Sequence, residues 1–194
     1  MYAGKGVTHS ERPAKEIAEN GGQFEIIQFW INTPAVKKMK AAEYIPLEKN
    51  ELKIIESPDQ NAQIHMIAGS IDGIKGPIDE DELVVANIMM KEGSNTSFNL
   101  DANHNTILYL LDGQITVNGK DITQAKSLII FNMDGEKVEI KAQENSRMLL
   151  LSGKPLEEEV VSYGPFVMNN TTQILEAMRD AQSGKMGILI EEFE

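Results

Sequence analysis

The residues with the clearest capacity for chemistry are His9 and Glu11, which one residue separates near the N-terminus. If residues 7–12 are extended, the two side chains point to the same face, because side chains alternate along a strand. An imidazole and a carboxylate on one face are suitable ligands for Fe(II), Mn, Ni or Zn. A His-x-Glu pair alone is a weak signal, since a histidine beside an acid is common in solvated loops and a first-row metal normally takes at least three protein ligands. We therefore expect a metal site at His9 and Glu11 only where further ligands join them.

The other two histidines, His65 and His104, are weaker candidates. Two glycines, Gly93 and Gly113, have the spacing that frames the first metal motif of a cupin barrel, but the ligand positions between them hold Asn99, Asp101 and Thr106. His104 is out of register with those positions, so we expect a polar residue at a strand edge. His65 alternates with apolar neighbours and is predicted to face the surface. The glycine frame without its ligands predicts a barrel that binds no metal.

Composition excludes several classes of function. The chain has 18 basic and 30 acidic residues and a formal net charge of −12, so neither a nucleic-acid backbone nor an anionic membrane is a suitable partner. It has no cysteine, which excludes disulfides and thiolate chemistry and fits a reducing compartment. No apolar run approaches the ~20 residues that span a bilayer, and the N-terminus lacks the apolar segment of a secretory signal. Glycine-rich phosphate loops and Gly-x-Ser-x-Gly elbows are absent, and residues 157–159 are predicted to form a solvated acidic cluster. We expect a soluble cytoplasmic protein.

The elements that must position the candidate residues are mostly strands. Short apolar runs occur at residues 84–90, 106–111, 127–131 and 148–151, and the turn pairs Asp112-Gly113, Asn118-Gly119 and Asp134-Gly135 lie between them. Asn-Gly and Asp-Gly pairs favour tight primed turns, in which both central residues have positive φ. Short strands with frequent turns predict a β-sandwich or barrel.

Both ends of the chain also carry local signals. Residues 24–31 are predicted to form a strand, Pro34 favours a helical turn after it, and residues 44–56 are expected to form two short strands. Near the C-terminus, Asn170 and Gln173 resemble a capping box that starts a helix with Ile174, Leu175, Met178 and Ala181 on one face. Gly184 is expected just past the end of that helix.

Three stretches of the sequence resemble the pirin family. They are residues 1–12, residues 24–39, and the C-terminal signature GKPLEEEVVSYGPFVMN at residues 153–169. The resemblance covers essentially the whole chain. It implies an all-β fold of the cupin type, a double-stranded β-helix (jelly-roll) barrel: one complete C-terminal barrel, a partial N-terminal barrel and a short C-terminal helix. The expected domains are 1–56, a partial N-terminal cupin segment, and 57–194, a C-terminal cupin domain with the helix.

The resemblance also implies a metal centre, usually iron, whose ligands in pirins are a His-x-His pair and a later His-x-Glu pair. His9 and Glu11 match the later pair as metal ligands, and Glu11 is also the candidate catalytic residue. The earlier pair has no counterpart, because Met1 aligns near the end of the first barrel, so we expect an N-terminally truncated member with half a metal site. Fe(II) or another divalent metal is the implied cofactor, or none.

Two functions follow from the resemblance. Pirins are described as quercetin dioxygenases and as iron-linked regulators that bind transcription factors. With two of four ligands, a non-enzymatic binding or regulatory module is the expected function. The alternative is a metal-dependent quercetin 2,3-dioxygenase whose site another chain completes. A partial barrel exposes sheet edges and apolar surface, so we also expect a homo-oligomer, with a protein partner as a further expectation.

Overall fold

The computed structural model describes residues 1–79 and 82–190 and divides the chain into two compact units. One unit is Leu47–Pro155, and the other combines Met1–Pro46 with the chain from Leu156 onward. This division differs from the domains 1–56 and 57–194 that the sequence predicts. The C-terminal helix groups with the N-terminal segment, and residues 47–56 group with the strands.

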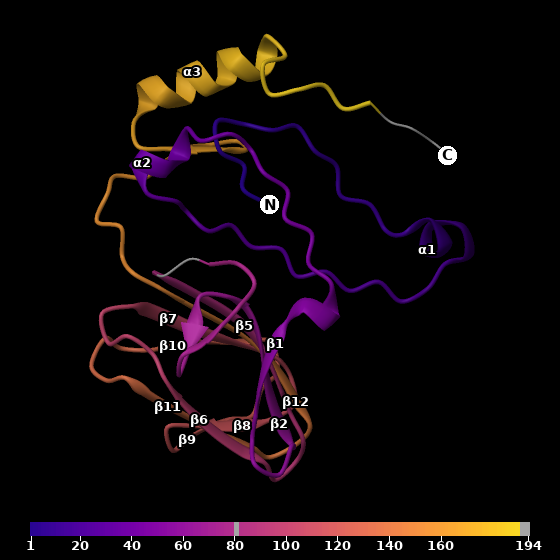
Figure 1. Cartoon of the computed structure of the whole chain (residues 1–194), viewed down its shortest axis with the longest axis vertical. Helices are drawn as coiled ribbons and strands as arrows, with labels where there is room; N and C mark the ends of the chain where they lie inside the picture. The colour runs from indigo at the N-terminus through magenta and orange to yellow at the C-terminus, as the bar shows by residue number, and fades with distance from the viewer. Residues whose placement is uncertain (80–81, 191–194) are drawn as a thin grey trace. The chain divides into compact units, whose positions relative to one another are not determined.

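Two antiparallel sheets build the unit Leu47–Pro155 (Figure 1). The first sheet has the strand order β1-β2-β5-β12-β7-β10, with bounds Lys53–Glu56, Ala62–Ala68, Leu83–Met90, Ser146–Gly153, Asn105–Asp112 and Ser127–Ile130. The second has the order β6-β11-β8-β9, with bounds Asn95–Asn99, Lys137–Ala142, Ile115–Val117 and Lys120–Ile122. A 3-10 turn (Lys49–Glu51) precedes β1, and a hairpin of β3 (Ser70–Ile71) and β4 (Ile74–Lys75) follows β2. The four apolar runs predicted as strands became β5, β7, β10 and β12.

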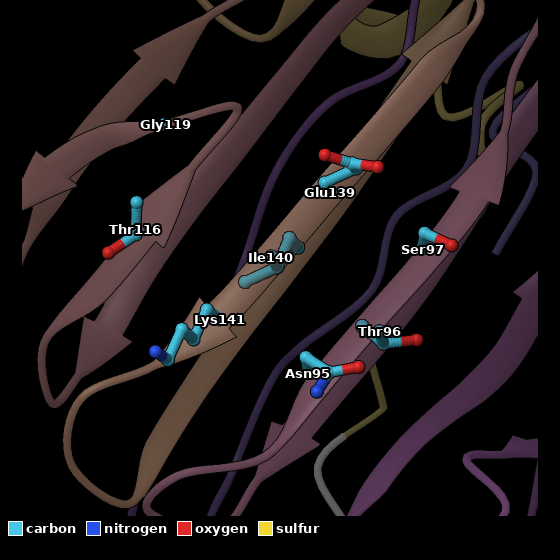
Figure 2. A pocket seen from close by; sticks show the side chains of 8 residues that line it. All are labelled: Asn95, Thr96, Ser97, Thr116, Gly119, Glu139, Ile140 and Lys141. Atoms are coloured by element: carbon cyan, nitrogen blue, oxygen red, sulfur yellow. The ribbon is translucent and has the colours of Figure 1, made fainter.

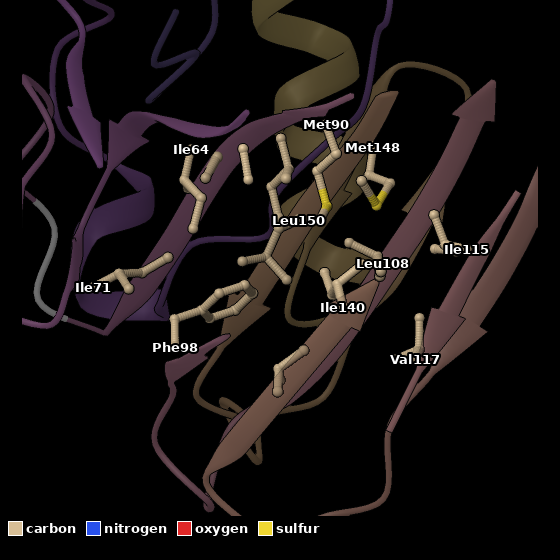
Figure 3. Packing of buried hydrophobic residues seen from close by; sticks show 14 of the residues in the cluster. Ile64, Ile71, Met90, Phe98, Leu108, Ile115, Val117, Ile140, Met148 and Leu150 are labelled. Atoms are coloured by element: carbon tan, nitrogen blue, oxygen red, sulfur yellow. The ribbon is translucent and has the colours of Figure 1, made fainter. Parts of the chain in front are cut away.

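The core of this unit lies between the two sheets. Alternate residues of each strand point inward; on β11 these are Val138, Ile140 and Ala142, all buried, whereas their neighbours are exposed. Figure 3 shows side chains of both sheets packed against one another, among them Phe98, Leu108, Met148 and Leu150. This arrangement confirms the predicted all-β, jelly-roll barrel.

Of the predicted primed turns, one has both central residues at positive φ. Asn118 and Gly119, between β8 and β9, have φ of 46° and 78°. At Asp112-Gly113 only the glycine is in this region, with φ of 89°, and at Asp134-Gly135 neither residue is. The three dipeptides therefore locate the breaks between strands, but only Asn118-Gly119 has the backbone of a primed turn.

The other unit contains three helices and one hairpin within its described residues. The helices are α1 (Lys15–Asn20), α2 (Ala35–Lys38) and α3 (Thr171–Gln182); the hairpin is β13 (Val161–Tyr163) with β14 (Phe166–Met168), and α3 packs against it (Figure 1). The helix α3 begins as predicted, because the Asn170 side chain accepts a hydrogen bond from the backbone N–H of Gln173 at 2.9 Å. On its predicted apolar face Ile174 is buried, whereas Leu175 is exposed.

The strand predicted at residues 24–31 is wrong. This segment pairs with no strand in the part of the chain that the structure describes, and all six of its large apolar side chains are exposed. Of the two strands expected in 44–56, only β1 forms. A strand exists only where a neighbour completes its hydrogen bonds, so β-favouring residues are not sufficient. Among the helices described, none is long and apolar enough to cross a membrane.

Candidate functional site

The structure brings the two predicted metal ligands together. Nε2 of His9 lies 3.6 Å from Oε1 of Glu11, and the two side chains are 44% and 47% exposed. Both residues lie in a stretch without regular secondary structure, residues 6–14. The pair therefore has the shared face that the sequence predicts, in a position open to solvent.

A third side chain, Gln28, holds the carboxylate of this pair. Nε2 of Gln28 donates to both carboxylate oxygens of Glu11, at 2.7 Å each. The contact connects the His9–Glu11 pair to the apolar segment 24–31. Sequence analysis missed Gln28, although it is the one uncharged polar residue within that apolar run.

The backbone before His9 is fixed by two other parts of the same unit. The N–H of Lys5 donates to the carbonyl of Lys40 at 2.9 Å, and the N–H of Thr8 donates to the carbonyl of Met186 at 2.8 Å. Gly6 has φ of 119°, and a Cβ at this position would collide with the side chain of Met186. Only glycine has both the backbone freedom and the absent side chain that this close approach requires.

The donor set at this site does not fit a complete mononuclear metal centre. His9 and Glu11 supply two ligands, and residues 1–79 and 82–190 contain no group of three His, Cys, Asp or Glu side chains placed to hold a metal ion. A first-row metal normally takes three or more protein ligands. The described residues thus supply two candidate ligands, and we derive no chemistry through a metal from them.

A buried polar network lies in the same unit. Lys38 is 6% exposed, and its Nζ donates to Oδ1 of Asn32. Burial lowers the pKa of Lys38, and the nearby carboxylate of Glu158 opposes this shift. Oε2 of Glu158 also accepts from the backbone N–H of Ala35 at 2.8 Å and from Nδ2 of Asn169 at 3.2 Å.

The prediction that residues 157–159 form a solvated acidic cluster holds for Glu157 and Glu159, which are exposed, but not for Glu158. Glu158 is half-buried and links the start of α2 to the end of the β13–β14 hairpin. Oδ1 of Asn169 is buried without a hydrogen-bond partner among the described atoms. We assign Glu158 a structural role, since its carboxylate satisfies the first turn of α2.

Both remaining histidines lie in the barrel and are buried. His65 on β2 is 3% exposed, so the prediction of a surface-facing residue is wrong. His104 directly precedes β7, as a strand-edge residue would, but it is 9% exposed and its Nδ1 lies 3.3 Å from Oγ of Ser152. Neither histidine joins the His9–Glu11 pair in a ligand cluster within the described chain.

The outer face of the second sheet carries a hollow of about 310 Å³. Figure 2 shows its lining on three strands, with Ser97 on β6, Glu139 on β11 and Thr116 on β8 among the labelled residues. The lining is mainly uncharged and polar, and it contains no histidine. This hollow shares no residue with either histidine environment in the barrel.

Comparison with known proteins places the chain in a family. Residues 85–187 match the Pirin C-terminal cupin domain. The chain is 32% identical to Pirin-1 of Arabidopsis thaliana over 96% of its own length and 64% of that protein. A Thermoplasma acidophilum protein with the provisional name quercetin 2,3-dioxygenase is 30% identical over 95% of the chain and 76% of that protein.

A solved structure agrees with these relatives. The crystal structure of quercetin 2,3-dioxygenase from Acinetobacter baumannii superposes with a TM-score of 0.77 at 29% identity, over 83% of this chain and 56% of that one. The chain also spans only 65% of a Pseudomonas aeruginosa relative that has the same provisional name. The signature at residues 153–169, the barrel and these matches together show that the chain belongs to the pirin family of cupin proteins.

Proposed function

We propose that this chain acts as a pirin-type binding or regulatory module and not as a complete enzyme. The observation that carries the proposal is the donor set of the candidate site: one imidazole and one carboxylate, with both oxygens of the carboxylate already bound by Gln28. Two ligands hold a first-row metal weakly. We place this module in the cytoplasm, where a sequence without cysteine is at home.

The second candidate function is a metal-dependent oxygenase of the quercetin 2,3-dioxygenase type. The 3.6 Å approach of His9 to Glu11 favours it, because a histidine and a carboxylate on one side are two ligands of the kind that Fe(II) takes in oxygenases. In this proposal another chain supplies the remaining ligands, Glu11 acts as ligand and catalytic residue, and the metal supplies the open coordination positions. The provisional names of the relatives support the same activity.

We further propose that the chain associates with a second copy of itself. Residues 24–31 contribute six exposed large apolar side chains, Phe24, Ile26, Ile27, Phe29, Trp30 and Ile31. Exposed apolar surface of this extent is typical of interaction sites. The segment also holds Gln28, so a partner that covers it would lie close to Glu11.

The test titrates Fe(II) into the purified chain without oxygen and measures the heat of binding by calorimetry. The proposed module binds no stoichiometric iron at micromolar concentration, and His9→Ala and Ser10→Ala, an exposed neighbour, behave alike. Tight binding of one Fe(II) per chain that His9→Ala abolishes and Ser10→Ala retains would overturn the binding-module proposal. A dioxygenase assay on the iron-loaded sample would then test the second candidate.

A further inference from the structure

The barrel contains a cavity at one end of the space between its two sheets. Its volume is about 290 Å³, and its lining includes residues of β7 and β10 from the first sheet and of β8, β9 and β11 from the second. Strand register places these residues at the same end, since Ile130 pairs with Ile107 and Lys137 pairs with Asn99. Because both sheets contribute and the rim residues are exposed, the cavity is a hollow at the open end of the barrel.

The lining of this cavity combines apolar walls with polar and charged residues. Leu100, Val117, Ile122, Ile129, Phe131 and Val138 line it, and Val117 is also one of the packed core residues in Figure 3. Phe131 supplies an aromatic ring, which favours contact with another ring. Apolar walls with a small number of polar groups are typical of sites for small molecules, and the volume is at the small end of their range.

Three polar side chains, Ser152, Thr106 and His104, are hydrogen-bonded to one another and lead from the core to this cavity. Oγ of Ser152 lies 2.8 Å from Oγ1 of Thr106 and 3.3 Å from Nδ1 of His104. All three side chains are at least nine-tenths buried. His104 and Thr106 line the cavity, whereas Ser152 does not. Because Nδ1 contacts Ser152, Nε2 is the ring nitrogen that remains for a ligand.

The hydrogen bonds among Thr106, Ser152 and His104 can run in two directions, and the direction decides which group a ligand must offer to His104. If Thr106 donates to Ser152 and Ser152 donates to Nδ1, the neutral imidazole presents Nε2–H as a donor. If instead Nδ1–H donates to Ser152 and Ser152 donates to Thr106, Nε2 is an acceptor and the Thr106 hydroxyl is free to donate. A hydroxyl group both donates and accepts, so it satisfies either arrangement.

The charges around the cavity exclude an ionic ligand. The lining has three carboxylates, Asp101, Asp134 and Glu136, and two ammonium groups, Lys120 and Lys137, and Lys137 is paired with Glu139 at 2.5 Å. The balance is therefore negative, as in the whole chain, and opposes an anion. A cation would lose its hydration against apolar walls without a buried carboxylate to pair with.

We propose that this end of the barrel binds a small, uncharged aromatic alcohol, whose hydroxyl group hydrogen-bonds to the imidazole of His104. The site does not depend on the His9–Glu11 pair or on a metal. The aromatic ring lies between the apolar walls, and the hydroxyl group replaces water at His104.

The test uses three probes of one shape: 1-naphthol, naphthalene and 1-naphthoate. Each is titrated into the chain with methyl-labelled isoleucine, leucine and valine and followed by NMR. We expect 1-naphthol to bind once per chain with a dissociation constant on the order of 100 µM. Naphthalene should bind about tenfold more weakly, because it lacks the hydrogen bond, and naphthoate should not bind. The methyl signals of Val117 and Ile129 should shift, and that of Ile64 should not.

Variants then test the role of His104. His104→Phe should reduce 1-naphthol affinity to the level of naphthalene, and His104→Gln, whose amide also donates and accepts, should retain most of it. The matched control is His65→Gln, which changes a buried histidine of the same barrel that does not line the cavity.

Three results would overturn the proposal. They are no saturable binding of 1-naphthol, equal affinity for naphthol and naphthalene, and shifts confined to methyl groups outside the cavity. If His104→Phe does not fold, the comparison of the three probes on the unmodified chain decides the question without it. The proposal would also be contradicted if His104→Phe folds and binds 1-naphthol as tightly as the unmodified chain.

Discussion

The three histidines of the chain lie in three different environments. His9 is half exposed beside a carboxylate, His104 is bound through Nδ1 to a buried hydroxyl, and His65 is almost fully enclosed on β2. The first is open to solvent, the second lines the cavity proposed as a binding site, and the third contributes to packing. The solvent exposure and the neighbours of each histidine thus decide its role.

His65 makes the stability of the barrel depend on pH. Burial lowers the pKa of His65, the charge of Lys49 lowers it further, and Glu56 opposes the shift. The unfolded chain therefore takes up this proton at the ordinary histidine pKa of about 6.5, whereas the folded chain takes it up only at lower pH. The contribution of His65 to stability is intact above about 6.5 and is lost as the pH falls toward the pKa of the folded state.

The measurement is urea unfolding of the chain and of His65→Gln at about pH 7.5 and about pH 5.5. We expect the unmodified chain to lose more of its free energy of unfolding between the two values than the variant. Carboxylates with lowered pKa, such as Asp59 and Asp101, act at lower pH and equally in both proteins. Equal losses in the two proteins would contradict the assignment.

The candidate ligands are predictable from the sequence, but their surroundings are not. His9 and Glu11 are two residues apart, so an extended backbone was sufficient to place them together. Gln28 reaches Glu11 across 17 positions, and the burial of His65, His104 and Glu158 depends on strands and loops far along the chain. Contacts of this kind are set by tertiary packing, which local periodicity does not describe.

At the scale of elements, features with a local cause were predictable and features with a distant cause were not. The start of α3 depends on Asn170 and Gln173, and the strands β5 and β7 follow from short apolar runs separated by turn residues. Residues 24–31 have the same β-favouring composition but no neighbour to pair with among the residues described. Composition therefore predicts a tendency to form strands, and the topology decides which of them form.

The turn after β7 should be sensitive to substitution. Gly113 has φ of 89°, and a Cβ there would collide with Oγ of Ser146 and the carbonyl of Asn145. We expect Gly113→Ala to reduce the free energy of unfolding by about 2–4 kcal/mol, because backbone strain and a steric clash add. Gly119→Ala is the control, since its φ is 78° but its Cβ would meet no atom within 4 Å; it should cost about 1 kcal/mol. Equal effects in urea unfolding would show that the predicted clash is relieved.

The cap of α3 gives a second prediction at this scale. Asn170→Ala removes the acceptor for the N–H of Gln173 and should destabilise the helix by about 1 kcal/mol. Thr172→Ala, an exposed change in the first turn, should be neutral or slightly stabilising. Hydrogen exchange of the α3 amides distinguishes the two. Unchanged protection in Asn170→Ala would contradict the capping role.

For the whole molecule, the main question is what covers residues 24–31. If the proposed self-association is correct, light scattering should give about twice the chain mass of 21.5 kDa, and Trp30→Ser should shift the protein toward the monomer. Val36→Ser, which changes an apolar residue of α2 that is 89% exposed, is the matched control and should not. A monomeric unmodified chain would refute self-association through this segment.

The central claim is that one chain supplies only half of a metal centre. Native mass spectrometry of the purified protein tests it directly, because each species is weighed together with its bound metal. We predict that any monomeric species carries no metal, and that metal is found only on species that contain a second chain. A monomer that carries one metal ion, lost in His9→Ala, would contradict the claim and make the chain a complete metalloprotein.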